Sequence, residues 1–117
     1  MSRTLRVYWP ARTSGWINFN WQGVIDGGSV VHISACESKH INPGGISHDY
    51  SFPKKVGEER VRGDATIYVK NIRPHDEGGG GVEFFLQVDW NTPLPVITDI
   101  SVLDPPAEGD RGAFLVV

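Results

Sequence analysis

Residues 82–90, Val-Glu-Phe-Phe-Leu-Gln-Val-Asp-Trp, show the clearest pattern in the chain. Apolar side chains recur at every second position of this stretch, at Val82, Phe84, Leu86, Val88 and Trp90. Except for Phe85, the residues between them are polar. A period of two is typical of a β-strand with one face in the core and the other in water. We therefore predict a strand over residues 82–90, with Trp90 on its core face.

The segment before this strand is predicted to pair with it. In residues 65–72, Ala65, Ile67 and Val69 alternate with Thr66, Tyr68 and Lys70. The intervening residues 73–81 contain Pro74 and four consecutive glycines, which favour a turn over regular structure. Together the two segments predict a β-hairpin with a long, flexible tip.

Three other segments, residues 5–9, 17–22 and 29–36, place apolar side chains at alternate positions, and residues 96–103 are a further predicted strand. Because Asp26-Gly27-Gly28 tolerates positive φ, we expect a second hairpin that joins the strand ending near residue 25 to residues 29–36. Residues 37–64 are less regular, and one short edge strand is expected near residues 49–52. The apolar tail, residues 113–117, is expected to pair as a strand.

The chain is predicted to be all-β. Its fourteen glycines and eight prolines interrupt every segment that is long enough for a helix. Seven to eight short strands in one domain, residues 1–117, indicate a two-layer antiparallel sandwich, either immunoglobulin-like or a related Greek key. Cys36 is the only cysteine, so the internal disulfide of antibody domains is excluded.

Charge and hydropathy exclude two classes of partner. Eleven lysines and arginines stand against fourteen aspartates and glutamates, so no strong positive field attracts nucleic acid. No run approaches the roughly 18 apolar residues of a membrane-spanning helix. The first residues lack the apolar segment of a secretory signal, so we expect a cytoplasmic protein, with export after processing as the alternative.

Catalysis is the less favoured interpretation, and no cofactor is expected. The sequence contains no nucleophile elbow, no His-Glu-x-x-His and no phosphate-binding loop. Histidines and carboxylates in two loops form a weak metal-ligand candidate: His40, His48, Asp49, His75 and Asp76. Their spacing matches no common ligand pattern, so solvated loop residues are the favoured alternative.

The aromatic residues point to binding. Trp9 and Trp21 fall on core faces of their predicted strands, whereas Trp16 lies beside Gly15 at a predicted turn. Next to Trp16, the side chains of Asn18, Asn20 and Gln22 form a row on one strand face. An exposed ring beside amides that can donate and accept hydrogen bonds suits a hydroxyl-rich ligand, so these four residues are the candidate glycan site. An ordinary solvated strand face is the alternative.

A second aromatic pair indicates a different function. Tyr68 and Phe85 fall on the outward faces of the two strands of the first hairpin, where they could be cross-strand neighbours. Exposed aromatic pairs are usually covered by a partner. The chain is therefore expected to be a binding or assembly module, with a glycan, another protein or a second copy of itself as partner.

Overall fold

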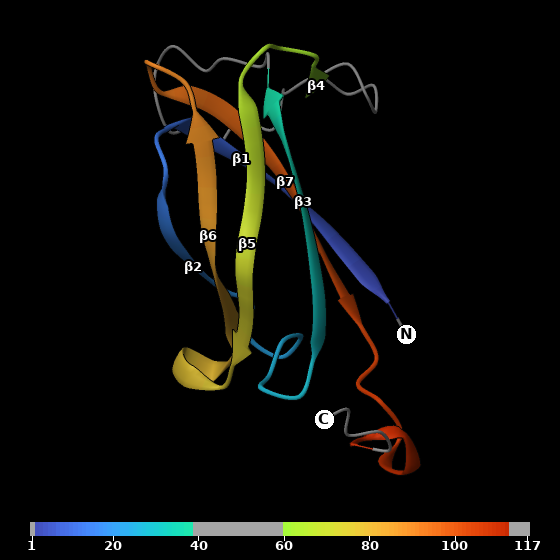
Figure 1. Cartoon of the computed structure of the whole chain (residues 1–117). Helices are drawn as coiled ribbons and strands as arrows, with labels where there is room; N and C mark the ends of the chain where they lie inside the picture. The colour runs from blue at the N-terminus through green and yellow to red at the C-terminus, as the bar shows by residue number, and fades with distance from the viewer. Residues whose placement is uncertain (1, 39–59, 113–117) are drawn as a thin grey trace.

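The computed structural model describes residues 2–38 and 60–112, and its strands form two antiparallel sheets (Figure 1). A four-stranded sheet has the order β1-β7-β3-β4, and a three-stranded sheet has the order β2-β6-β5. The strands are β1 (Arg3–Arg12), β2 (Gly15–Asn20), β3 (Val30–Ser38), β4 (Arg60–Val61), β5 (Thr66–His75), β6 (Gly81–Asp89) and β7 (Leu94–Leu103). Two single 3-10 turns, Glu77–Gly79 and Glu108–Asp110, complete the described elements. The all-β prediction with antiparallel sheets is confirmed.

Strand pairing is nested along the chain. Among the described strands, the first, β1, pairs with the last, β7, and β2 pairs with β6. In an immunoglobulin sandwich the first strand lies beside the second. The immunoglobulin-like part of the prediction is therefore not confirmed.

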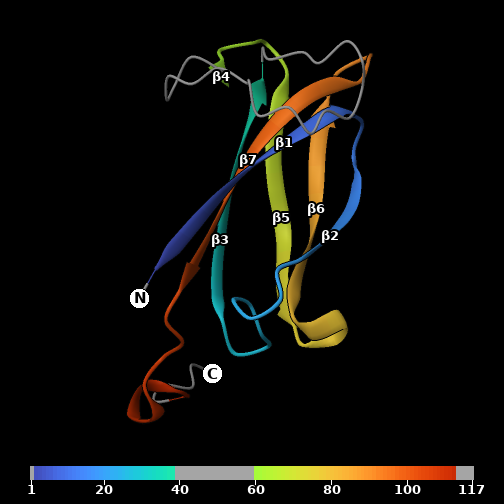
Figure 2. The same cartoon turned by 180° about the vertical axis from the view of Figure 1, so that it is seen from behind.

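The expected second hairpin is wrong, because the strands on either side of residues 26–28 belong to different sheets. β2 lies in the three-stranded sheet and β3 in the four-stranded sheet, so the chain crosses between the layers here (Figure 2). The backbone N–H groups of Val24 and Ile25 both donate to the carbonyl of Trp21, at 3.2 and 3.1 Å. This turn ends the extended path of β2 and places Ile25 in the core, where it is buried.

The core lies between the two sheets and is centred on β6. Val82, Phe84 and Leu86 are completely buried and Val88 nearly so, as the alternation of residues 82–88 predicts. They form one cluster with buried side chains from both sheets and from the turn after β2, namely Ile17, Ile25, Val31, Val96, Ile100 and Val102. The half-buried rings of Trp9 and Trp21 pack against this cluster, and Trp9 Nε1 donates to the buried Thr98 Oγ1 at 2.8 Å.

Trp90 departs from the predicted alternation. The prediction placed it on the core face, but 49% of the residue is exposed. β6 ends at Asp89, and the Trp90 N–H donates to the Val88 carbonyl at 3.1 Å in a tight turn. Because the strand ends one residue before Trp90, the alternation between inward and outward side chains does not extend to Trp90.

The β5–β6 hairpin is confirmed, but its tip is shorter than expected. β5 continues to His75, and Pro74 lies opposite Val82 in the register. A proline is tolerated there because β5 is an edge strand of its sheet. The tip folds closely over the turn that follows β2, since a Cβ on Gly80 would lie 1.9 Å from the Ile25 carbonyl oxygen.

A carboxylate ties together three strands of the other sheet. Asp99 on β7 accepts two hydrogen bonds from Arg6 on β1, at 2.8 and 3.0 Å, and a further one from Arg60 on β4. The hydrogen bond from Arg6 and the charges of both arginines hold the pKa of Asp99 below its ordinary value, against the opposing effect of burial.

Two predicted strands, residues 49–52 and 113–117, lie outside the described residues. In the part of the chain that is described, no helix is long and apolar enough to cross a membrane.

Phe84→Ala and Trp90→Ala form a matched pair that tests the position of the core. Because Phe84 is fully buried, its truncation should lower the free energy of unfolding by about 3–5 kcal/mol. Trp90→Ala should change it by less than about 1 kcal/mol, because the ring is half exposed. Urea unfolding followed by circular dichroism measures both values, and equal losses would contradict the described core.

Asp99→Asn should make the free energy of unfolding less dependent on pH in the acidic range. A carboxylate whose pKa is lowered by folding stabilises the protein above its unfolded pKa, about 3.9, and this contribution is lost as the pH falls through the lower folded pKa. The wild-type chain should therefore lose more stability between neutral pH and pH about 3 than Asp99→Asn does. Thermal melts across this range provide the measurement, and parallel curves would exclude the ion-pair contribution.

Candidate binding face of the three-stranded sheet

The side chains of β2, β6 and β5 that point away from the core form rows, because β2 and β5 both pair with β6, and a register shift in β5 lies between Lys70 and Arg73. One row runs Trp16, Phe85, Lys70 and the next Asn18, Glu83, Arg73. The next register partners are Asn20, Gly81 and His75, of which only Asn20 has an exposed side chain. On the other side of the first row, Gln87 lies opposite Tyr68. We call this surface the outer face; its three strands run side by side in Figure 1.

Trp16 is the most exposed large apolar side chain on this face. It is 62% exposed, and its ring meets that of Phe85 edge to face, with centroids 5.4 Å apart and planes at 86°. The Lys70 ammonium lies 4.9 Å from the centroid of the same Phe85 ring. Phe85 is thus a half-buried support between an exposed indole and a cation.

The structure places both predicted aromatic sets on one surface. Tyr68, which is 42% exposed, shares the outer face with Phe85 as the interface hypothesis requires. However, the residues directly opposite Phe85 are Trp16 and Lys70, and Tyr68 is only its diagonal neighbour. Sequence reasoning treated Trp16 and Phe85 separately, because no local signal indicates that β2 pairs with β6.

The predicted row of amides is only partly available to a ligand. Asn18 Nδ2 donates to Asn20 Oδ1 at 3.0 Å, and the exposed Asn20 remains at the end of β2. Gln22 lies beyond the strand, where its Nε2 donates to the Gly78 carbonyl at 2.8 Å. Gln22 therefore holds the hairpin tip, and Trp16, Asn18 and Asn20 are the members of the set that β2 presents.

A buried histidine lies beneath this row. His75 is 4% exposed, and its Nε2 lies 2.6 Å from Asn18 Oδ1. An amide oxygen can only accept a hydrogen bond, so Nε2 carries the proton. The other ring nitrogen, Nδ1, is buried without a hydrogen-bond partner, and Glu77 Oε2 lies 3.6 Å from it. Sequence reasoning missed this pair, whose members are 57 residues apart and belong to opposite edge strands.

The metal-ligand candidate is only partly described. His40, His48 and Asp49 lie outside the described residues. Of the other two, His75 binds Asn18, and Asp76 Oδ1 accepts a hydrogen bond from the Gly27 N–H at 2.8 Å. Within residues 2–38 and 60–112, no three His, Cys, Asp or Glu side chains are grouped closely enough to hold a metal ion.

The charges on the outer face are unequally paired. Arg73 Nη1 donates to Glu83 Oε1 at 2.7 Å, and this bond, together with the charge of Glu77, raises the pKa of Arg73. Gln87 similarly donates to Asp89. In the described part of the chain, no carboxylate forms an ion pair with Lys70. Among the described residues, the Lys70 ammonium therefore has the Phe85 ring, and no carboxylate, beside it.

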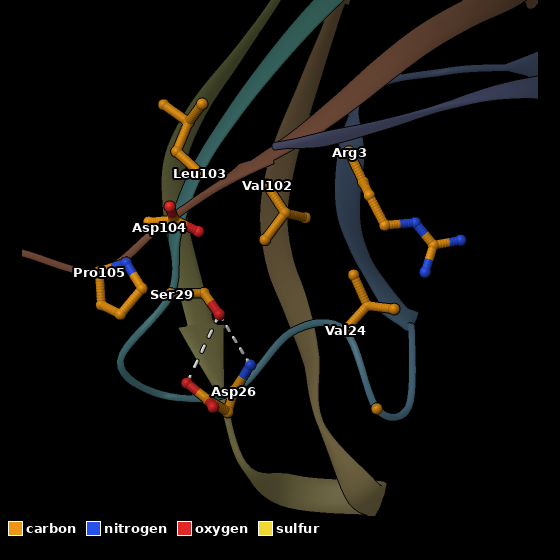
Figure 3. Close-up of a pocket in the computed structure, with 9 residues that line it drawn as sticks. Arg3, Val24, Asp26, Ser29, Val102, Leu103, Asp104 and Pro105 are labelled. Carbon is orange, nitrogen blue, oxygen red and sulfur yellow. Dashed lines mark hydrogen bonds between the residues drawn. The ribbon is translucent and has the colours of Figure 1, made fainter. Parts of the chain in front are cut away.

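A separate pocket of about 260 Å³ opens near the start of β1 and the end of β7 (Figure 3). It is lined by Arg3, Gly23, Val24, Asp26, Ser29, Val102, Leu103, Asp104 and Pro105. Two of its polar groups are already used to close a turn, because Asp26 N–H donates to Ser29 Oγ at 3.0 Å and Asp26 Oδ1 accepts from the Gly28 N–H at 2.8 Å. We therefore favour the outer face as the candidate site.

Asn18→Ala tests the contact beneath the face. It removes the oxygen that binds a nearly buried imidazole, so we expect a loss of about 1–3 kcal/mol in the free energy of unfolding. Asn20→Ala is the control, because that side chain is exposed, and it should lose less than about 1 kcal/mol. Equal losses in urea unfolding would show that the bond to His75 contributes nothing.

No protein-family model matches this chain. No curated protein and no solved structure matches it either. The residues of the outer face are therefore the basis for assigning a function to the chain.

Proposed function

We propose that this chain is a non-catalytic binding module that holds carbohydrate on the outer face of its three-stranded sheet. The exposure of Trp16 carries the proposal. The Trp16 indole is 62% exposed, so most of its apolar surface remains in contact with water. A flat apolar ring of this kind is well suited to stack on the apolar face of a sugar. Its edge-to-face contact with Phe85 holds the ring in one orientation before any ligand arrives.

The polar side chains around the Trp16 ring offer hydrogen-bond donors and acceptors to sugar hydroxyls. Asn20 and Gln87 have amides that both donate and accept hydrogen bonds, and the paired Glu83 and Arg73 add an acceptor and a donor. These residues lie on both sides of the aromatic row along the strands. A surface with a central ring and flanking polar groups fits several successive sugar units of an extended chain.

The positive charge of Lys70 favours acidic over neutral carbohydrates as ligands. It is the cation of the outer face without a carboxylate partner among the described residues, and it lies against the ring that supports Trp16. A carboxylate on a sugar would gain a charge-assisted hydrogen bond there, which a neutral sugar cannot form. We therefore propose that polysaccharides containing uronic acids bind more tightly than neutral ones.

A homo-oligomeric or protein-interaction module acting through Tyr68 and Phe85 is the second candidate. The exposure of Tyr68 favours it. Phe85 offers less to a partner, because Trp16 and Lys70 already contact its ring. Under this alternative, Tyr68→Lys would abolish association with the partner without unfolding the chain, and no polysaccharide would bind.

Trp16→Ala, compared with Trp90→Ala, tests the carbohydrate proposal. Both tryptophans are exposed, but Trp90 follows the end of β6 and does not belong to the outer face. Trp16→Ala should weaken binding about tenfold or more, equivalent to ~1.4 kcal/mol, whereas Trp90→Ala should bind like the wild type. Titration calorimetry with soluble neutral and uronate-containing polysaccharides gives the affinities.

Lys70→Ala tests the proposed preference for uronate-containing polymers. It should reduce binding of the uronate-containing polymers and leave neutral polymers unaffected. The proposal fails if no polysaccharide binds, or if both tryptophan variants lose affinity equally.

A further inference from the structure

One edge of β2, which no other described strand occupies and which we call the free edge, is formed by the backbone of the residues whose side chains lie on the outer face. Asn20 is opposite Gly81 in the register, so Trp21 is opposite Gly80, and the Trp21 N–H donates to the Gly80 carbonyl at 3.0 Å. Hydrogen-bonded and non-hydrogen-bonded pairs alternate along an antiparallel ladder. The N–H and C=O groups of Trp16, Asn18 and Asn20 therefore point away from β6, toward an edge where no described strand pairs with them.

The other sheet edges among the described residues carry features that discourage further pairing. β1 contains Pro10, a register shift between Trp9 and Arg12, and three arginines. β5 contains Pro74 and a register shift at Asn71, which has a φ of +54°. β5 also lies next to β3 in both views of the molecule, and β4 has only two residues (Figures 1 and 2). Proline, bulges, positive charges and short strands are the usual means of protecting an edge.

β2 has none of these features. Its sequence, Gly-Trp-Ile-Asn-Phe-Asn, contains no proline and no charge, and its register with β6 is regular over all six residues. An edge strand of this kind is a ready template for another strand.

We infer that β2 pairs antiparallel with β2 of a second copy of this chain. Self-pairing brings each residue of a strand close to the same strand of the partner, so like charges would repel. That repulsion would affect the arginines of β1, whereas β2 is neutral and meets no such cost. The partner assigned to this edge is therefore another β2.

The resulting dimer would carry one continuous binding surface. Directly opposite residues of an antiparallel pair point to the same side of the sheet, so the two outer faces would join across the twofold axis into one six-stranded sheet. Both Trp16 side chains would then face the same way. A linear polymer could contact both at once, which raises its apparent affinity without any new contact within one chain.

Asn20→Pro tests the inference, with Asn20→Ala as its matched control. Proline removes the outward N–H of residue 20 but no hydrogen bond to β6, whereas alanine removes the same side chain and keeps the N–H. Sedimentation equilibrium from micromolar to near-millimolar protein should show the wild type and Asn20→Ala passing from one chain to two. Asn20→Pro should remain a single chain.

Amide hydrogen exchange gives a readout that does not depend on how well a variant folds. In the wild-type chain, exchange at Trp16, Asn18 and Asn20 should slow as the protein concentration rises. The inference is overturned if the wild type stays monomeric throughout, if these amides exchange equally at all concentrations, or if a folded Asn20→Pro still dimerises.

The outcome is separable from that of the proposed function. Trp16→Ala keeps its backbone N–H and should dimerise while losing carbohydrate. Asn20→Pro and Asn20→Ala both keep Trp16 and lack the same side-chain amide, so they should bind short oligosaccharides with equal affinity, whereas only Asn20→Pro should lose the avidity for long polymers.

Discussion

The packing of β6 against β7 across the interior is the interaction on which the rest of the fold depends. β6 is the central strand of its sheet, and β7 has a neighbour on both sides in the other. Phe84 and Leu86 from one and Val96 and Ile100 from the other are completely buried. Burial of large apolar side chains is the main favourable term in folding, and these strands contribute most of the fully buried ones.

The candidate site follows from the same constraint. Because Phe84 and Leu86 must point inward, Phe85 between them must point outward, and it cannot turn without removing its neighbours from the core. Phe85 is thereby placed where Trp16 and Lys70 can contact it from the adjacent strands. A rigid core position thus supports an exposed ring.

The alternation of apolar and polar residues along each strand predicted part of the fold and of the outer face. It identified β6, the β5–β6 hairpin and the outward direction of Tyr68 and Phe85. It could not show that β2 pairs with β6, because their partners are more than sixty residues apart in sequence and pairing at that distance leaves no local trace. For the same reason, the contact between Asn18 and His75 was not foreseen. The exposure of Trp90 was missed because a turn, and not hydrophobicity, ends β6.

The outer face and the free edge are linked by the geometry of one strand. Along a β-strand, the side of the sheet to which a side chain points and the edge to which the backbone groups point both alternate with a period of two. In β2, the residues that face outward are therefore the residues that face the free edge, namely Trp16, Asn18 and Asn20. Their side chains can contact a ligand while their N–H and C=O groups pair with another strand. The proposed carbohydrate binding and the proposed self-association therefore use different atoms of the same short, neutral strand.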